Sequence, residues 1–308
     1  MTATTTAPAG VVEADRRAPN RNRKPLRPAR VVLYVFLTVV ALGWLAPLLL
    51  AVYASLRPYA ETAKYGYFSL PHHLSLHYYS LAWSSGDMPK YFRNTLIIAL
   101  PSVFLVLFFA SFVAFSLSRV KIPGRKTLLI MFAAGNLLPP QVMVTPLYTA
   151  YTKIPLPTFL SSSETLYDSY LGVIAIHVAF QTGFCVFVLY NYMQTIPTEL
   201  TEAAAVDGAS LWRQYWQVIL PLTRPALGAL ATLEFTWIYN DFLWALVLMT
   251  SGDKLPITSA LNNLRSEFFT DYNLLAAGSV LVALPTLIVF FALQKQFVSG
   301  LTLGANKG

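Results

Sequence analysis

The chain has 308 residues, of which 56% are hydrophobic and 12% are charged, and its net charge is +8. Soluble domains carry roughly 25% charged residues, so this composition excludes an ordinary soluble protein and indicates a membrane protein. The single cysteine, Cys185, excludes a disulfide framework and a cysteine metal cluster within the chain.

The N-terminal 30 residues are basic and contain almost no large apolar side chains. They hold seven of the 22 basic residues, so the positive net charge needs no nucleic-acid partner. We expect residues 1–30 to form a disordered cytoplasmic arm. The apolar run from Val31 to Ala54 is 24 residues long, whereas the apolar core of a signal peptide has about 7–15 residues. This run therefore predicts an uncleaved first span.

Apolar segments long enough to cross a bilayer recur along the chain. A spanning helix needs about 20 apolar residues. Six segments meet this requirement: 31–55, 94–118, 127–151, 170–192, 225–250 and 275–296. The third is the weakest, because Gly135, Asn136, Pro139, Pro140 and Pro146 interrupt it. We expect an all-α integral membrane protein with a six-span domain over residues 31–296 and a cytoplasmic tail over 297–308. Proline also falls within other spans, which is typical either of helices that line a conduit or of ordinary kinks.

The distribution of basic residues predicts the orientation of the chain. If the N-terminus is cytoplasmic, the inside segments, with Lys295, hold 15 basic residues and the outside loops hold 7. Four of the inside charges lie in the short segment 119–126, and short loops carry the most weight. We therefore expect both termini, and the polar segment between the fourth and fifth spans, to be cytoplasmic.

That polar segment, Glu199 to Pro225, predicts a pair of short helices. Thr198 is a candidate N-cap, residues 200–206 are rich in alanine, and Asp207-Gly208 favours a helix end. Ser210 can cap a second helix that runs to about Leu220 and that Pro221 is expected to stop.

The first of these helices has the character of a docking surface. The alanine face 203–205 would allow close approach of another backbone, and Glu202 is free for a charged partner. The alternative is an amphipathic helix that contacts only lipid headgroups. Such helices are usually rich in Lys or Arg, whereas this one carries acids at Glu199, Glu202 and Asp207. The acids favour a protein partner.

The order of residues in this segment resembles the EAA loop of bacterial ABC importer permeases. The resemblance rests on Glu202-Ala203-Ala204, Asp207-Gly208-Ala209, Ile219-Leu220-Pro221 and Pro225. Other segments resemble the second permease of maltose-type sugar importers: Arg93-Asn94-Thr95, Ser118-Arg119, Pro123-Gly124-Arg125, Pro139-Pro140-Gln141, Pro146-Leu147-Tyr148, Asn240-Asp241-Phe242-Leu243-Trp244, and Phe297 to Thr302 with Gly304-Ala305. One departure is Ile238-Tyr239, where that family commonly has a tryptophan next to the asparagine.

The resemblance implies a complete transport assembly. The chain would pair with a homologous permease in a bacterial inner or plasma membrane, above a dimer of ABC ATPase subunits that bind the ATP and magnesium. An extracytoplasmic sugar-binding protein would deliver cargo. The EAA loop would be the coupling helix that docks into the ATPase, with Glu202, Ala203, Ala204, Asp207, Gly208 and Pro221 as its key residues. Closure of the ATPase dimer would then rock the helices between inward-facing and outward-facing states.

Polar residues within the spans are candidates for the substrate pathway. Glu234 and Asp241 are seven residues apart, which on one helix would place them on the same face, and Tyr239 and Asn240 extend the polar patch. Acids at membrane depth are functional candidates by default. His177 and Gln181, one turn apart in the fourth span, fit hydrogen bonds between helices better than a sugar site.

Several motifs are absent from the sequence. It has no G-x-x-x-x-G-K-[ST] motif for ATP and no cysteine–histidine spacing for a metal, and His72, His73 and His77 fit a polar loop. We therefore expect a transport subunit, with no cofactor or metal of its own, rather than an enzyme. Alternatives are an importer permease for glycerol 3-phosphate or another polyol, an integral membrane enzyme, and an ATP-independent transporter. The lack of Lys and Arg deep in the spans favours a neutral sugar.

Overall fold

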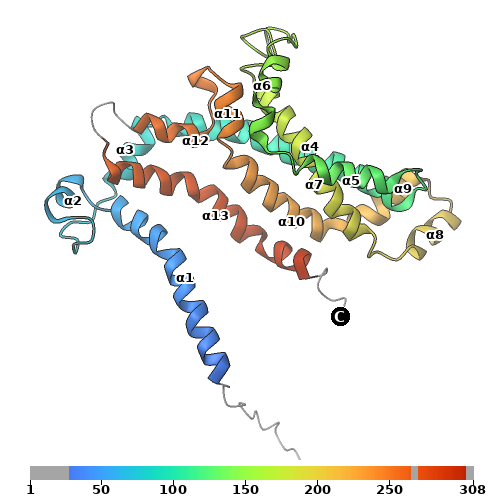
Figure 1. The fold of residues 1–308 in the computed structure, drawn as a ribbon, viewed down its shortest axis with the longest axis horizontal. Helices are drawn as coiled ribbons and strands as arrows, with labels where there is room; N and C mark the ends of the chain where they lie inside the picture. Colours follow the sequence, from blue (N-terminus) through green and yellow to red (C-terminus); the bar gives the residue numbers. More distant parts are fainter. Residues whose placement is uncertain (1–27, 265–269, 303–308) are drawn as a thin grey trace, which may run out of the picture. The chain divides into compact units, whose positions relative to one another are not determined.

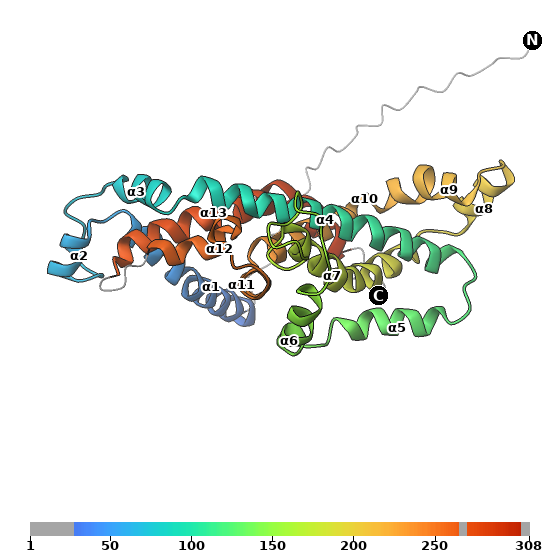
Figure 2. The same ribbon diagram turned by 90° about the horizontal axis from the view of Figure 1, so that it is seen from above.

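The structure, a computed structural model, describes residues 28–264 and 270–302 (Figures 1 and 2). These residues are almost entirely helical, and the β-type pairing among them is one isolated bridge between Pro155 and Thr165. The predicted all-α class is confirmed. The chain divides into two compact units, residues 1–49 and residues 50–308.

The first helix, α1 (Pro28–Ser55), covers the predicted first span. Its residues up to Leu49 are the described part of the first unit, and its apolar side chains point in all directions around the helix axis. Residues 28–30, predicted to belong to the disordered arm, are already helical, and residues 1–27 lie outside the described part. A single helix has no core of its own, so its apolar surface needs lipid or protein around it.

Long apolar helices account for most of the predicted spans. Five stretches among the described residues are long and apolar enough to cross a membrane: Pro28–Ser55, Met88–Arg119, Tyr170–Met193, Leu211–Tyr239 and Tyr272–Gln294. In the second unit these correspond to α4 (Met88–Arg119), α7 (Tyr170–Met193), α10 (Leu220–Tyr239) with the turns before it, and α13 (Tyr272–Thr302). In this unit α4 packs on α7 and α10, and α10 packs on α13 (Figures 1 and 2).

The predicted third span is broken. It consists of α5 (Arg125–Gly135) and α6 (Pro140–Tyr151), which meet at an angle of 93°. Pro140 opens α6, and the residue before a proline is restricted to extended backbone. Pro139 accordingly has φ −61° and ψ 128°, which prevents α5 from continuing. Residues 28–264 and 270–302 therefore hold five candidate spans, or six if this bent pair crosses the membrane as one.

One predicted boundary in the second half of the chain is wrong. The fifth span does not run to residue 250, because α10 ends at Tyr239 and a separate short helix, α11 (Leu243–Leu248), follows. The Asp241 carboxylate accepts a hydrogen bond from the Trp244 N–H at 3.2 Å and so starts α11. At the C-terminus, α13 continues to Thr302, so the first residues of the predicted tail, 297–302, are helical. Residues 303–308 lie outside the described part.

Short helices complete the second unit. They are α2 (Tyr59–Tyr65), α3 (His77–Ser85), α8 (Glu199–Val206), α9 (Leu211–Gln214), α12 (Ile257–Ala260), and the 3₁₀ turns Gly252–Lys254 and Leu261–Leu264. The helices of this unit enclose two apolar clusters. One lies around Ile98, Phe235 and Trp244, and the other around Val106, Leu189 and Ile219.

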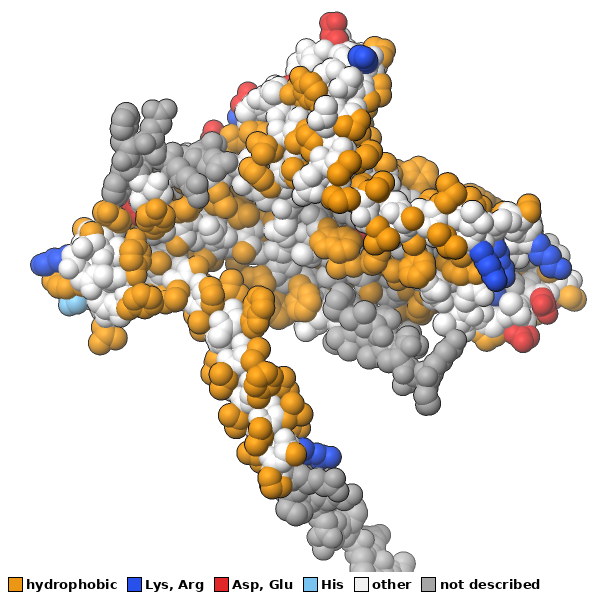
Figure 3. Space-filling view, viewed as in Figure 1, with side chains coloured by type: hydrophobic (Ala, Val, Ile, Leu, Met, Phe, Trp, Pro, Cys, Tyr) orange, Lys and Arg blue, Asp and Glu red, His pale blue; other side chains and the backbone are white. Residues whose placement is uncertain are grey.

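Much of the exposed charge lies near one end of this bundle. Figure 3 shows hydrophobic side chains over much of the visible surface and a group of basic and acidic side chains at the end where α8 lies. The exposed charged residues there are Arg125, Lys126, Glu199, Glu202 and Asp207. Other exposed charged residues, Lys64, Lys153 and Glu164, lie elsewhere. This separation of apolar and charged surface is the one expected of a bundle that sits in a bilayer.

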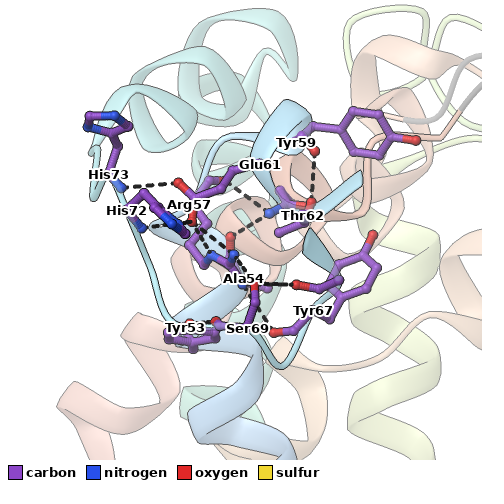
Figure 4. Close-up of polar contacts among 12 residues, drawn as sticks. Tyr53, Ala54, Arg57, Tyr59, Glu61, Thr62, Tyr67, Ser69, His72 and His73 are labelled. Carbon is purple, nitrogen blue, oxygen red and sulfur yellow. Dashed lines mark hydrogen bonds and ion pairs between the residues drawn. The ribbon is translucent and has the colours of Figure 1, made fainter. Parts of the chain in front are cut away.

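The loop after α1 is organised around one buried ion pair (Figure 4). Arg57 is fully buried, and its Nε and Nη2 donate to the Glu61 carboxylate at 3.1 and 2.9 Å. Glu61 in turn accepts hydrogen bonds from the backbone N–H groups of His72 and His73, at 2.9 and 3.0 Å. Asn273 of α13 donates to the Arg57 carbonyl at 2.9 Å. The ion pair thus holds both the loop and its contact with α13.

Acid should release this loop. Above all the His72 N–H, and then the Arg57 guanidinium, lower the pKa of Glu61 from 4.5 to about 2. A carboxyl whose pKa is lower in the folded state adds stability above pH 4.5, and that stability is lost as the pH falls towards 2. We predict that hydrogen exchange at the amides of His72 and His73, corrected for its intrinsic pH dependence, rises across this range.

Glu61→Gln should show the same rapid exchange at neutral pH, because it removes the carboxylate without changing the size of the side chain. Glu164→Gln is the matched control, since Glu164 is exposed. Unchanged protection in Glu61→Gln would contradict the role assigned to the ion pair.

Candidate functional site

The α8–α9 segment, residues 199–219, forms the predicted helix pair. It comprises α8, α9 and a single π-helical turn, Tyr215–Ile219, that leads into α10. On α8, Glu202, Ala203 and Ala205 are exposed, and the side chain of Val206 is 88% exposed. No ion pair to the acids of α8 is found among the described residues. The helix therefore presents small side chains, the apolar side chains of Leu200 and Val206, and carboxylates without an ion pair to its surroundings.

The turn between α8 and α9 is a Schellman motif centred on Gly208. The Gly208 N–H donates to the Ala205 carbonyl at 3.0 Å, and the Ala209 N–H donates to the Ala204 carbonyl at 2.8 Å. Gly208 has φ 79°, in the left-handed region that side chains disfavour, and an added Cβ would meet nothing within 4 Å. The cost of a larger residue here would therefore come from the backbone conformation and not from a clash.

The caps of the two helices differ from one another. Ser210 caps α9 as predicted, since its Oγ accepts a hydrogen bond from the Arg213 N–H at 3.4 Å. Thr198 stands directly before α8 as predicted, but its side chain makes no capping hydrogen bond to that helix, so the predicted capping is wrong. Thr198 has helical backbone angles, φ −69° and ψ −26°, whereas a capping side chain usually needs an extended residue.

The prediction that Pro221 stops the second helix is wrong. The chain passes from α9 through the π turn into α10, and Pro221 lies in the first turn of α10. Within a regular α-helix the proline ring clashes with the carbonyl four residues earlier. The π turn carries the Leu220 N–H to the Tyr215 carbonyl, one residue further back than in an α-helix. This wider turn places the proline without breaking the helix.

Two of the four pathway candidates are buried within the chain itself. Glu234 and Tyr239 are both 0% exposed. The Cys185 thiol of α7 donates to the Glu234 carboxyl at 3.1 Å, and the Tyr239 hydroxyl donates to the Val282 carbonyl of α13 at 2.9 Å. Both residues therefore join α10 to a neighbouring helix.

The other two candidates lie in the break after α10. Asn240 is exposed, and its amide donates to the Thr236 carbonyl at 2.8 Å. The Asp241 carboxylate lies 3.7 Å from Nε2 of His177 on α7, with 16% of its side chain exposed. Glu234 and Asp241 do not share one helix, since α10 ends between them, but both face α7. His177 faces the break after α10, and its buried Nε2 makes no hydrogen bond within the described part of the chain, so the hydrogen bond between helices preferred from the sequence is not found there.

The sequence interpretation missed the role of the residues that hold the α8–α9 segment in place. Arg119, noted in the sequence as an orienting charge and as part of the family resemblance, donates from Nη2 to the carbonyls of Met193 and Ile196 at 2.8 and 2.7 Å. Tyr215 contacts Ser111 of α4 through a 2.8 Å hydrogen bond between hydroxyls. The position of Arg119 at the end of a span could have indicated this role, because an arginine there can bind the carbonyls of a neighbouring helix end. Nothing in the sequence pattern pairs Ser111 with Tyr215.

Comparison with known proteins gives one consistent family. Residues 95–302 match the model for "binding-protein-dependent transport system inner membrane component". The osmoprotective compounds uptake permease protein GgtD of Synechocystis is 31% identical over 303 residues, which cover 96% of this chain and 98% of the relative. The arabinooligosaccharides transport system permease protein AraQ of Bacillus subtilis is 30% identical over 283 residues, 91% of this chain and 96% of the relative.

The fold agrees with a solved importer. A chain from a bacterial ABC transporter involved in the import of the acidic polysaccharide alginate superposes with a TM-score of 0.72. The match covers 87% of this chain and 96% of that one, at 24% sequence identity. Since the family match spans well over half of the chain, this protein belongs to the inner membrane components of binding-protein-dependent transport systems, as a multi-pass ABC transporter permease and not an enzyme.

Proposed function

We propose that this permease forms half of the pathway of an ATP-driven sugar importer, and that α8 docks on the ATPase subunit. The observation that carries the proposal is the exposed surface of α8, where free carboxylates stand beside alanines. Buried or paired acids would indicate a structural helix. Acids without ion pairs next to small side chains fit a cleft of another protein that offers basic groups.

The proposed assembly includes a homologous second permease, two ATPase subunits and an extracytoplasmic binding protein. Support comes from the family, whose description names binding-protein-dependent systems, and from a second solved structure of the alginate transporter, in complex with a periplasmic protein bound to an alginate pentasaccharide. That chain superposes with a TM-score of 0.63. ATP and magnesium belong to the ATPase in this proposal, and this chain supplies no ligand for either.

The proposed orientation places α8 and both termini in the cytoplasm. It rests on the excess of basic residues in the segments on that side, 15 against 7. The start of α5, which carries Arg125 and Lys126, and α8, which carries the acids, lie near the same end of the bundle (Figures 1 and 2). Docking at this end would expose the ATPase to cytoplasmic ATP.

The proposed cargo is a neutral sugar or oligosaccharide. Several relatives have names that refer to sugars: arabinooligosaccharides for AraQ of Bacillus subtilis and alpha-glucosides for AglG of Rhizobium meliloti. The lack of basic residues deep in the spans also favours a neutral molecule. The name of GgtD, which refers to osmoprotective compounds, supports a polyol or another small polar solute as the second candidate.

Purification tests the assembly. Expressed with its neighbouring genes and extracted in mild detergent, the tagged chain is expected to co-purify with a second permease and an ATPase. ATP hydrolysis by this complex should be stimulated by the binding protein loaded with its sugar. A chain that transports alone in proteoliposomes would contradict the proposal, as would a complex that lacks an ATPase.

Substitutions in α8 and its turn should separate ATP hydrolysis from uptake. Gly208→Val forces a β-branched residue to φ 79°, at a cost of about 1–2 kcal/mol or more, and should tilt α8 out of its docking position. Glu202→Lys reverses a docking charge. We expect uptake to fall about tenfold or more per molecule of ATP hydrolysed, with unchanged membrane insertion.

Gly252→Val and Glu164→Lys are the matched controls for these two variants. Gly252 has open space around an added Cβ and no left-handed φ, and Glu164 is exposed on another loop. Full uptake by both α8 variants would exclude the proposed docking role.

The pathway candidates should separate into two groups. Asn240 is accessible, so Asn240→Ala should raise KM for uptake several-fold with little change in thermal stability. Glu234 is buried, so Glu234→Ala should instead lower stability by about 2 kcal/mol, because it leaves a cavity and removes the acceptor of the Cys185 thiol. Uptake kinetics and a thermal melt on each variant distinguish the groups. A changed KM for Glu234→Ala at unchanged stability would place Glu234 in the pathway.

A further inference from the structure

The last third of α4 carries a row of residues that faces the α8–α9 segment. Ser111, Phe115 and Arg119 follow one another at intervals of four residues, so they lie on one side of the helix. Ser111 and Phe115 are 2% and 4% exposed. This side of α4 contacts the α8–α9 segment and its approach at two separate places.

The first contact is at the chain that leads into α8. The Arg119 guanidinium binds the Met193 carbonyl, at the end of α7, and the Ile196 carbonyl, two residues before Thr198. The Gln194 amide donates to the Ser118 carbonyl at 3.3 Å. Carbonyls at a helix end have no partner within the helix, so a guanidinium that binds two of them fixes both helix end and linker.

The second contact is at the chain that leaves α9. Tyr215, which opens the π turn, is 1% exposed, and its hydroxyl is 2.8 Å from the Ser111 Oγ. Its ring centroid lies 4.6 Å from that of Phe112 and 5.3 Å from that of Phe115. The Trp212 ring packs against Phe112 at 5.2 Å. Aromatic contacts at these distances add to the hydrogen bond, so this end of the segment is also attached firmly to α4.

The segment between the two contacts is stiff. The Schellman motif joins α8 to the turn, and the Gln214 amide donates to the Ala209 carbonyl at 2.9 Å. A body held at one point can rotate about that point, whereas a stiff body held at two points must move with its support. Ser111 and Arg119 are eight residues apart, which is about 12 Å along α4.

We propose that α4 receives the displacement of α8, with Arg119 and Tyr215 as the positioning residues that transmit it. The inference rests on the proposed function, in which the ATPase pushes α8. It also says which helix depends on side chains to follow α8. The backbone joins α7 and α10 to the α8–α9 segment, whereas only side-chain contacts join α4 to it. Loss of these side-chain contacts should therefore loosen α4 from the α8–α9 segment, while α4 keeps its packing on α7 and α10 and the backbone still ties those two helices to α8.

Distances between spin labels test this difference. One label goes on Val206→Cys of α8, paired either with Phe104→Cys of α4 or with Trp237→Cys of α10. These three side chains are 88%, 66% and 45% exposed, and Cys185 is fully buried and protected from labelling. Pulsed electron paramagnetic resonance on the assembled complex, without nucleotide and with trapped ADP–vanadate, should give an α8–α4 distance that is narrow and the same in both states.

The variant Arg119→Gln with Tyr215→Phe removes the guanidinium and the hydroxyl but keeps the size of both side chains. The population in which α8 has left α4 should rise about tenfold or more, since hydrogen bonds of this kind each shift an equilibrium about fivefold or more. The α8–α4 distribution should then broaden and change with nucleotide, whereas the α8–α10 distribution should not. Arg119→Lys, which keeps one charged donor, should partly restore the narrow distribution.

Tyr192→Phe with Arg213→Gln is the matched control. It removes a hydroxyl bonded to the Leu222 carbonyl and a guanidinium bonded to Gln217, neither of which contacts α4. If the test variant gives the same α8–α4 distribution as this control, the proposal is wrong. If no ATPase co-purifies, the proposed function fails by itself, and the width of the α8–α4 distribution in the nucleotide-free chain still decides whether the two contacts hold.

Discussion

Every backbone N–H and C=O at membrane depth needs a partner within the protein, and this constraint governs each break between the helices. Long helices satisfy their own groups except at their ends. At those ends the chain places polar side chains. Arg119 binds the carbonyls after α7, and Asn94 of α4 donates to the carbonyls of Asp253 and Leu255 at 2.7 and 3.0 Å. The Asn273 amide likewise donates to the carbonyls of Ala54 and Arg57. The polar residues of the bundle thus stabilise its irregular segments.

This use of polar groups separates structural from functional acids. Glu61, Glu234 and Asp241 each contact a neighbouring side chain or backbone N–H, and each joins two elements of the chain. The acids on α8 have exposed side chains and no ion pair among the described residues. Glu199 and Glu202 lie in the first turn of α8, where they interact favourably with the helix dipole, but they join α8 to no second element and so remain available to a partner. The coupling role proposed for α8 follows from this contrast rather than from the presence of acids as such.

Much of the fold could be predicted from the sequence, because hydropathy over about 20 residues reports directly on burial in lipid. The boundaries were harder to predict: α4 begins at Met88 rather than at residue 94, because its first turns include the charged residues Lys90 and Arg93. Gly208 and Ser210 were predictable because their conformations are local. Pro221 was not, since a π turn depends on packing around Tyr215. The Arg119 and Tyr215 contacts join residues more than 70 positions apart, beyond any local pattern.

The side chain of Arg119 has two separate roles. As a positive charge it helps to set the topology of the chain, and there lysine would serve equally well, as at Lys121 and Lys126. As a hydrogen-bond donor it reaches two carbonyls at once through Nη2, which lies one bond further from the backbone than the Nζ of a lysine. Exchange between the two basic residues should therefore be free in the rest of segment 119–126 and restricted at its first position. Shifting this charge to test topology would also disturb the mechanical connection between α4 and α8.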